Sequence, residues 1–312
     1  MKPEILLVCP LYDGTMDQLD RAYTVHRLWE AKDQPALLRE VRDRVRGIST
    51  MGAVGCKAEL MAALPKTEII ACFGVGVDAI DLKAAKERGI RVTNTPDVLT
   101  ECVADLGMTL LLASAREIPQ GDRFVREGKW LKGNYPLCRH VGGKLLGIVG
   151  FGRIGQAVAK RAAAFGMEIA YYGRRKNPES AYPYYSDIKK LAADSDYLML
   201  TVPGGPETRH LVDAEVLKAL GPEGTLVNIA RGSIVDEAAM VKALKDGTLD
   251  AAALDVFQNE PNVPQELLTM ANVVLQPHQG SATHETRAAM GQLVVDNLAA
   301  HFAGRPLLTP VV

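Results

Sequence analysis

The sequence predicts an α/β protein made of two Rossmann-like domains, each a doubly wound parallel sheet. Short apolar runs typical of buried strands alternate with helical patterns along almost the whole of the 312 residues. A chain of this length provides two domains of ordinary size. One apolar run also leads into a glycine-rich turn and then a helix, as in the first βα unit of such a fold.

The composition narrows the class of protein further. Hydrophobic residues make up 47% of the chain and charged residues 23%, as in ordinary globular proteins. The net charge of −1 gives no electrostatic reason to expect a nucleic-acid partner or a membrane. The apolar run at residues 5–9 is too short for a signal peptide. The five cysteines form no C-x-x-C pair, so we expect thiols in the cytoplasm and no metal site.

The first third of the chain predicts one domain, at residues 1–99. Strands are expected at residues 5–9, 47–50, 69–73 and 91–95, and helices at 58–64 and 82–88. Gly89 directly follows the second of these helices, which is the usual position of a C-terminal glycine cap. The long apolar segment at residues 98–118 has the length of a buried helix that links two domains.

The middle of the chain predicts a second domain, at residues 100–284. Strands are expected at residues 145–149, 169–172, 197–202, 226–229, 251–256 and 273–275, which is the size of a full dinucleotide fold. Helices are expected to begin near Arg153, Asp187, Asp213 and Asp236. A final helix at residues 283–302 is expected to return to the first domain, which residues 285–312 would then complete.

The glycine-rich turn Gly150-Phe151-Gly152-Arg153-Ile154-Gly155 is the most informative motif. In this setting Gly150 permits the tight turn, Gly152 lets phosphates approach the backbone, and Gly155 lets the helix pack on the strand. The N–H groups at the helix start would then face a diphosphate. The alternative is an ordinary strand–helix turn without a ligand.

A basic turn indicates which dinucleotide is bound. An acidic residue normally ends the second strand and binds the ribose 2′-hydroxyl. Here that strand is followed by Gly173, Arg174, Arg175 and Lys176, with no carboxylate. Because arginine forks match phosphate oxygens, this turn favours NADP(H) over NAD(H), although NAD(H) use stays possible and a solvated basic turn is the alternative.

Three side chains that could perform chemistry follow neighbouring strands of the second domain. They are Arg231, Glu260 and His278. Ligands of doubly wound sheets bind beyond the carboxyl ends of the strands, so we expect the three to converge. A guanidinium can bind a carboxylate and polarise a ketone, and an imidazolium oriented by a carboxylate can donate a proton. Each could instead be a plain loop residue, but together they are what reduction of a 2-oxo acid requires.

Together these segments resemble the D-isomer-specific 2-hydroxyacid dehydrogenase family over nearly the whole chain. The matching motifs are the glycine-rich turn, residues 228–232, residues 255–261 and residues 277–281, with 75–78, 94–96 and 99–105 in the first half. The branch with a similar basic turn comprises NADPH-dependent glyoxylate/hydroxypyruvate and hydroxyphenylpyruvate reductases. Gly173 stands where NAD-using relatives have an acid, which puts NAD use in doubt.

The resemblance implies a substrate-binding first domain, an NAD(P)-binding second domain, a cleft between them that holds the active site, and a homodimer. It places the catalytic roles on Arg231, Glu260 and His278, and the nicotinamide carboxamide near Asp255. Substrate contacts are expected from Met51, Gly52, Val75, Gly76, Arg231 and His278. Besides the two turns, cofactor contacts are expected from Thr100, Val202, Ile229, Ala230, Asp255 and Gly280.

The activity expected from these residues is NADPH-dependent reduction of a small 2-oxo acid, of the glyoxylate or hydroxypyruvate type, to the (R)-2-hydroxy acid. The alternatives are an arylpyruvate reductase, an NAD-linked relative acting on formate or phosphoglycerate, and a non-catalytic dinucleotide-sensing protein. Retention of all three chemical residues argues against the last of these. The loop at residues 50–54 is small and uncharged, so the sequence does not select one 2-oxo acid.

Overall fold

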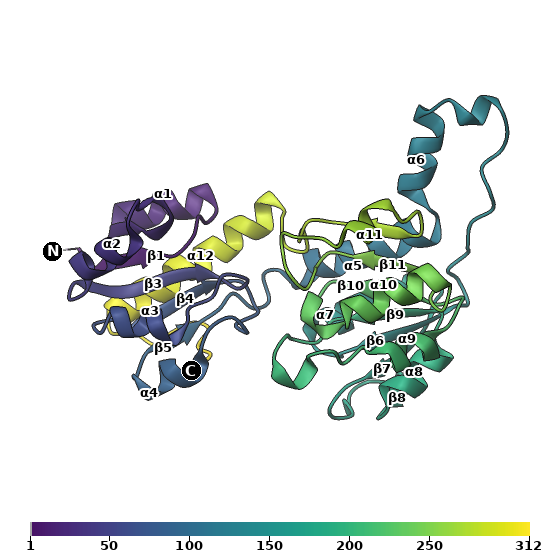
Figure 1. Ribbon diagram of the computed structural model, residues 1–312. Coiled ribbons are helices and arrows are strands. Elements are labelled where there is room, and N and C mark those ends of the chain that lie inside the picture. Colours follow the sequence, from purple (N-terminus) through teal and green to yellow (C-terminus); the bar gives the residue numbers. More distant parts are fainter. Residues whose placement is uncertain (1) are drawn as a thin grey trace. The chain divides into compact units, whose positions relative to one another are not determined.

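The computed structural model describes residues 2–312, which form two compact units (Figure 1). Unit 1 holds the chain up to Leu99 and again from Ser281 to Val312, and unit 2 is Thr100–Gly280. Unit 2 thus ends at Gly280, whereas the sequence analysis drew that boundary after residue 284. No helix in the described part of the chain is long and apolar enough to cross a membrane.

Unit 1 is built on a five-stranded parallel sheet in the order β2-β1-β3-β4-β5. Its strands are β1 (Glu4–Leu7), β2 (Thr24–Arg27), β3 (Val45–Met51), β4 (Ile69–Phe73) and β5 (Arg91–Thr93). The sequence analysis missed β2. This strand lies at the edge of the sheet and carries polar, partly exposed residues, so it lacks the apolar run that marks a buried strand.

Helices cover the unit 1 sheet. They are α1 (Asp13–Ala22), η1 (Leu28–Glu30), α2 (Gln34–Val41), α3 (Ala58–Ala63), α4 (Leu82–Glu87) and α12 (His284–Phe302). The last of these, α12, packs on α1 so closely that a Cβ on its Gly291 would lie 1.7 Å from the hydroxyl oxygen of Thr15. The final helix therefore belongs to unit 1 and packs closely on it.

Unit 2 is a seven-stranded parallel sheet in the order β12-β11-β10-β9-β6-β7-β8. Its strands are β6 (Leu145–Val149), β7 (Glu168–Tyr172), β8 (Tyr184–Tyr185), β9 (Tyr197–Leu200), β10 (Thr225–Asn228), β11 (Ala251–Leu254) and β12 (Val273–Leu275). The prediction of six strands missed β8, whose two residues are too few to give a periodic signal.

The helices of unit 2 lie on both faces of this sheet, with α5 against α7 and α8 against α9. They are α5 (Thr100–Ala115), α6 (Ile118–Arg126), α7 (Arg153–Ala164), α8 (Ile188–Asp194), α9 (Ala214–Leu220), α10 (Glu237–Asp246) and α11 (Gln265–Thr269), with the short turns η2 (Lys129–Leu131), η3 (Pro206–Thr208) and η4 (Gly232–Ile234). The predicted helix starts near Asp187, Asp213 and Asp236 are confirmed. Each aspartate caps its helix by accepting a backbone N–H bond.

The sequence analysis predicts one helix over residues 98–118, and this prediction is wrong. The segment forms α5, which ends at Ala115, and a new helix begins at Ile118. Glu117 between them has a φ of +48°, a left-handed conformation that breaks the helical path.

The order of strands in unit 2 creates a switch point. The chain begins at β6, runs outward through β7 and β8, and then returns to β9 and proceeds in the other direction. The loops that follow β6 and β9 therefore run in opposite directions from the carboxyl ends of these two strands. Doubly wound folds bind ligands at this place. The glycine-rich turn follows β6 directly.

Candidate active site

The glycine-rich turn is shaped to bring its backbone close to a ligand. Gly150 has a φ of +97°, a backbone angle that residues other than glycine rarely adopt. A Cβ on Gly155 would lie 2.2 Å from the carbonyl oxygen of Gly150, so glycine is needed for α7 to start this close to the strand. A Cβ on Gly152 would meet no described atom within 4 Å, so the turn leaves room there. This room in front of a helix N-terminus suits a diphosphate.

The basic turn follows β7 and presents its cations to solvent. Arg174, Arg175 and Lys176 are all exposed. Nη1 of Arg174 lies 2.8 Å from a carboxylate oxygen of Glu207, in η3. These two side chains are 83% and 76% exposed, so their ion pair is weak and can exchange for a stronger anion. The turn can therefore bind a phosphate group through guanidinium and ammonium donors.

Arg231 lies in the loop after β10, and a buried asparagine shapes that loop. Asn228, the last residue of β10, is 1% exposed. Its amide nitrogen donates to the carbonyl oxygen of Arg231 at 2.9 Å, and its amide oxygen accepts from the N–H of Ala230 at 3.0 Å. The Arg231 guanidinium donates to the carbonyl oxygen of Ala230 at 2.8 Å. The loop thus holds a half-buried guanidinium beyond the strand end.

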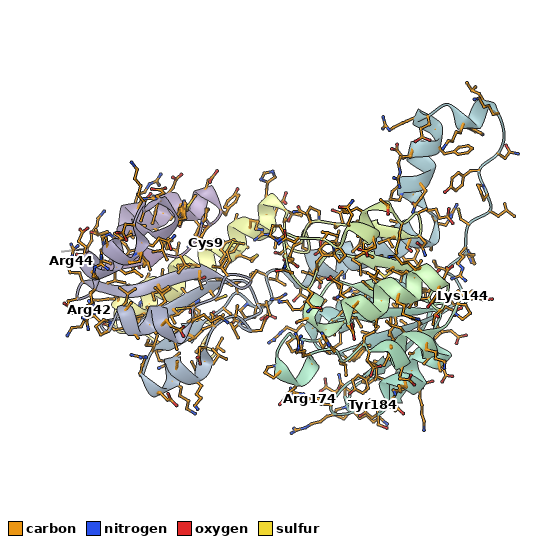
Figure 2. The ribbon with its side chains drawn as sticks, in the orientation of Figure 1. Cys9, Arg42, Arg44, Lys144, Arg174 and Tyr184 are labelled. Carbon is orange, nitrogen blue, oxygen red and sulfur yellow. The ribbon has the colours of Figure 1, made fainter. Side chains whose placement is uncertain are left out.

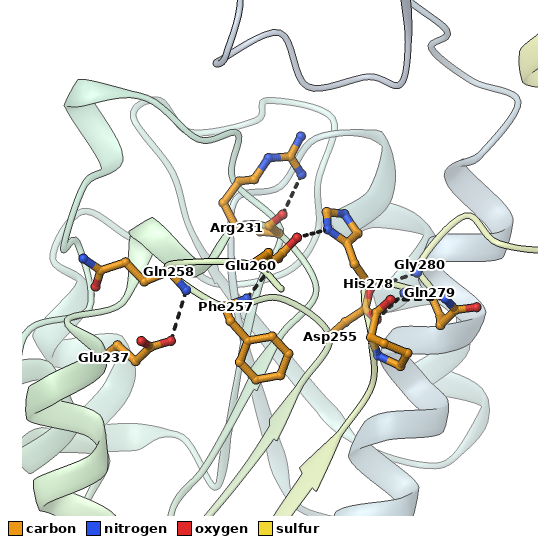
Figure 3. Close-up of polar contacts among 11 residues, drawn as sticks. Arg231, Glu237, Asp255, Phe257, Gln258, Glu260, His278, Gln279 and Gly280 are labelled. Atoms are coloured by element: carbon orange, nitrogen blue, oxygen red, sulfur yellow. Dashed lines mark hydrogen bonds and ion pairs between the residues drawn. The ribbon is translucent and has the colours of Figure 1, made fainter. Parts of the chain in front are cut away.

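Glu260 and His278 form a hydrogen-bonded pair next to Arg231 (Figure 3). Nδ1 of His278 lies 2.7 Å from Oε2 of Glu260. An ionised carboxylate only accepts, so Nδ1 is the donor, and Nε2 is the nitrogen left to exchange a proton with a ligand. The other oxygen of Glu260 accepts from the N–H of Phe257 at 3.0 Å, so the carboxylate is oriented by its own turn.

Asp255 anchors the backbone that carries His278. Its side chain is 1% exposed and accepts from the N–H groups of Gln279 and Gly280 at 2.6 and 2.8 Å. Its carbonyl oxygen accepts from the N–H of His278 at 2.8 Å. His278 itself has a φ of +54°, a conformation that is costly outside glycine and persists where surrounding bonds enforce it. The three bonds to Asp255 provide that enforcement.

Electrostatics distinguish the two carboxylates. Burial opposes ionisation of Glu260, yet the bond from His278, the Phe257 N–H and the charge of Arg231 together hold its pKa below the usual value. Burial raises the pKa of Asp255 more than its two backbone hydrogen bonds lower it. Glu260 is therefore the carboxylate better suited to stabilise an imidazolium, while Asp255 acts on the backbone.

The expected substrate residues of unit 1 lie at the carboxyl ends of β3 and β4. A Cβ on Gly74 would lie 3.5 Å from the nitrogen of Gly52, so the two loops are neighbours. Asn94 holds the second loop by donating to the carbonyl oxygen of Val75 at 2.9 Å. Within the described part of the chain, the N–H groups of Val75 and Gly76 donate to no backbone acceptor. Two such N–H groups can bind a carboxylate.

The remaining expected cofactor residues line the same strand ends of unit 2, apart from Thr100 at the start of α5. Val202 follows β9, and its side chain would be 2.7 Å from a Cβ on Gly150. Ile229 and Ala230 are each 7% exposed, so they offer a ligand only a small surface. Arg153 and Ile154 open α7. Their roles, those of the unit 1 residues and the expected cleft stay predictions.

Sequence reasoning missed two residues that build this site. Asn228 enters the sequence analysis only as part of a motif, although a polar residue at the end of an apolar strand is itself a signal. Gly232 was not assigned a role, yet a Cβ there would lie 1.9 Å from the carbonyl carbon of Phe257. The glycine lets the Arg231 loop approach the loop that carries Glu260. No local pattern indicates this contact, because Phe257 is distant in sequence.

Comparison with known proteins gives consistent matches. Residues 108–280 match the model of the D-isomer specific 2-hydroxyacid dehydrogenase, NAD binding domain. Glyoxylate/hydroxypyruvate reductase A of Arabidopsis thaliana is 49% identical, covering 99% of this chain and 98% of that protein. Hydroxyphenylpyruvate reductase of Plectranthus scutellarioides is 48% identical, with the same coverage.

Solved structures agree with this pattern. The NADPH-dependent glyoxylate/hydroxypyruvate reductase of Sinorhizobium meliloti, in complex with NADP and malonate, is 45% identical with a TM-score of 0.95. The match covers 100% of this chain and 97% of that one. A 2-hydroxyacid dehydrogenase of Ketogulonicigenium vulgare is 50% identical with a TM-score of 0.94, over 100% of this chain and 99% of that one.

Proposed function

Because the chain belongs to the D-isomer-specific 2-hydroxyacid dehydrogenase family, we propose that it reduces a small 2-oxo acid to the (R)-2-hydroxy acid with NADPH. The observation that carries this proposal is the hydrogen-bonded pair of His278 and Glu260 beside Arg231. The reaction needs a cation for the substrate carboxylate and a proton for the carbonyl oxygen, and these residues can supply both.

In this proposal Arg231 binds the substrate carboxylate and polarises the ketone through its planar fork. His278 donates a proton from Nε2 to the carbonyl oxygen, while Nδ1 keeps its bond to Glu260. Glu260 is a positioning residue that stabilises the charged imidazole before the proton is transferred. The N–H groups of Val75 and Gly76 are proposed to bind substrate carboxylate oxygens.

The site fits a dinucleotide with a 2′-phosphate. The glycine-rich turn leaves room at Gly152 for the diphosphate, and Arg174, Arg175 and Lys176 would hold the 2′-phosphate. When bound, NADPH supplies the hydride that reduces the carbonyl carbon. Malonate and NADP in the Sinorhizobium meliloti structure support a small acid and this cofactor, and NADH stays possible as a weaker alternative.

The test of cofactor choice is a double variant, Arg174→Ala with Arg175→Ala. Charge-assisted bonds contribute about 1.5–3 kcal/mol each, so losing two should weaken NADPH binding about a hundredfold or more. NADH binding should change much less. Titrations of both cofactors, followed by nicotinamide fluorescence, measure the two dissociation constants. Equal weakening of NADPH and NADH would remove this turn from 2′-phosphate recognition.

The test of activity is a substrate panel with NADPH followed by absorbance. Glyoxylate and hydroxypyruvate are expected to be reduced with the highest kcat/KM. The match to a hydroxyphenylpyruvate reductase makes an arylpyruvate the second candidate, so 4-hydroxyphenylpyruvate and pyruvate complete the panel. Absence of turnover with all four, with NADPH still bound, would instead favour a non-catalytic dinucleotide-sensing protein.

We also propose that the protein is a homodimer, formed through residues 117–140, here called the arm. Leu131 and Leu137 are 93% and 100% exposed, and Trp130 is 64% exposed. The arm lines most of an open hollow of about 650 Å³, whose walls include Phe124 and Trp130 as well as Arg139 and His140. Exposed apolar side chains gathered on one segment are typical of an interface.

We propose a cytoplasmic location as well. The five cysteines are thiols, which supports it.

A further inference from the structure

Tyr171 is a buried strand residue whose hydroxyl is bonded to the end of the basic turn. Its side chain is 0% exposed in β7. The hydroxyl accepts from the N–H of Asn177 at 2.9 Å and donates toward the carbonyl oxygen of the same residue at 3.4 Å. Asn177 directly follows Lys176, the last cation of the turn. A buried hydroxyl is costly without hydrogen-bond partners. Asn177 supplies those partners to the phenol, and the phenol in turn holds the end of the turn in place.

Tyr184 holds the other end of the same turn. Its hydroxyl donates to the carbonyl oxygen of Gly173 at 3.1 Å. Tyr184 lies opposite Tyr171 in the register of β7 and β8, so neighbouring strands supply the two anchors. Figure 2 shows Arg174 and Tyr184 at the same end of unit 2. The three cations therefore lie on a turn that is closed at both ends by tyrosine hydroxyls.

The ring of Tyr171 also connects this turn to the glycine-rich turn. Phe151 stacks on Tyr171 with ring centroids 4.3 Å apart and an interplanar angle of 23°. The N–H of Gly150 donates to the carbonyl oxygen of Tyr172, the next residue of β7, at 2.8 Å. One tyrosine thus has two separable parts. Its ring supports the diphosphate turn, and its hydroxyl supports the basic turn.

We propose that the hydroxyl of Tyr171 is a specificity-determining group that favours NADPH over NADH by holding the basic turn in its binding conformation. This inference rests on the proposed function, in which that turn binds the 2′-phosphate. A loop already held in its bound conformation loses less conformational freedom when the phosphate binds. The resulting increase in affinity applies to NADPH, which carries the 2′-phosphate. NADH lacks the 2′-phosphate that these cations would bind, so its affinity should depend far less on the hydroxyl.

The test is Tyr171→Phe, which removes the hydroxyl and keeps the ring. Losing hydrogen bonds of ordinary strength should weaken binding of adenosine 2′,5′-bisphosphate and of NADPH about three- to tenfold. Binding of 5′-AMP and of NADH should stay unchanged. Amide hydrogen exchange at Asn177 should become faster, and this readout is independent of activity. Tyr184→Phe should act in the same direction.

Tyr185→Phe is the matched control, because its hydroxyl bonds to Asp194 at 2.8 Å and not to the turn. It should leave both cofactor affinities unchanged. Equal weakening of NADPH and NADH by Tyr171→Phe, or no change in either, overturns the inference. If Arg174→Ala with Arg175→Ala separates the two cofactors while Tyr171→Phe does not, only this inference fails. If neither variant separates them, the cofactor assignment fails as well.

Discussion

Glu260 uses both of its carboxylate oxygens on the protein itself, one on His278 and one on the N–H of Phe257. This arrangement determines how the pair responds to pH. The pKa of Glu260 is lowered in the folded protein, so its contribution to stability is complete above the ordinary glutamate value. That contribution is lost only as the pH falls through the lowered value. Glu260 therefore stays ionised at neutral pH and orients His278 until the pH falls into the acid range.

The first residue-scale prediction concerns this pair. Reduction of a 2-oxo acid should decline only as the pH falls through the lowered pKa of Glu260, because the protonated carboxyl no longer holds His278 by a charged hydrogen bond. Glu260→Gln should lower the rate and remove this acid decline, since the amide cannot titrate and His278 loses its charged partner. His278→Gln should lower the reduction rate by about 10²–10⁴-fold. The measurement is kcat/KM against pH, and an unchanged profile in Glu260→Gln with an active His278→Gln would exclude the pair from proton transfer.

The second residue-scale prediction separates charge from shape at Arg231. Arg231→Lys keeps a cation but loses the bidentate fork that matches a carboxylate. Turnover should fall by about tenfold or more, consistent with one lost charge-assisted bond. NADPH affinity, measured by fluorescence, should stay near the wild-type value as an internal control. Wild-type kcat and KM in this variant would mean that Arg231 does not bind the substrate.

At the scale of elements, the site depends on how closely the loops after β10 and β11 approach each other. Gly232 at the start of η4 makes that approach possible, because no side-chain atom lies between it and the backbone of Phe257. Asn228 and Asp255, both 1% exposed, then fix the two loops by hydrogen bonds to backbone groups. The catalytic side chains are therefore carried by loops that buried polar residues hold in place.

The prediction at this scale is that Gly232→Ala damages the reaction more than cofactor binding. The added Cβ would be 1.9 Å from the Phe257 carbonyl carbon, so one of the two loops must shift. We expect a loss of kcat of about tenfold or more, since small displacements from reactive geometry are costly. The NADPH dissociation constant should change less than kcat, because the glycine-rich turn and the basic turn that hold the phosphates follow other strands. Unchanged kcat would show that the loops tolerate separation.

At the scale of the whole molecule, the arm is the part of unit 2 that extends away from the sheet (Figure 1). It packs on itself through Phe124 and Tyr135, whose ring centroids lie 5.2 Å apart in an edge-to-face arrangement. The hydroxyl of Tyr135 also donates to Glu117 at 2.6 Å. A segment with this internal order and exposed leucines is suited to dock on a second copy of the chain.

The whole-molecule prediction is that Leu131→Asp combined with Leu137→Asp converts a dimer into a monomer. Burying two aspartates without partners would cost more than an interface of ordinary size can supply. Light scattering after size-exclusion chromatography measures the molar mass. Leu308→Asp is the matched control, because Leu308 is 51% exposed in unit 1, outside the arm. A wild-type protein that is monomeric at micromolar concentration would contradict the proposal.

The sequence by itself determined the fold class, most strands and the three residues at the strand ends. Alternating apolar runs and aspartate caps are local signals, so they predict strands and helix starts without knowledge of the tertiary structure. The rule that ligands bind at the carboxyl ends of parallel strands then predicted that Arg231, Glu260 and His278 would meet. The structure brings these three together.

Only the tertiary structure decided what holds those residues in place. The left-handed backbone of His278, the contact of Gly232 with Phe257 and the bonds from Tyr171 to Asn177 each depend on distances between separate segments. The two-residue strand β8 and the break at Glu117 were likewise missed, because short elements and single dihedral angles leave no periodic pattern. Periodicity reports which face of an element is buried, whereas close packing decides what that face touches.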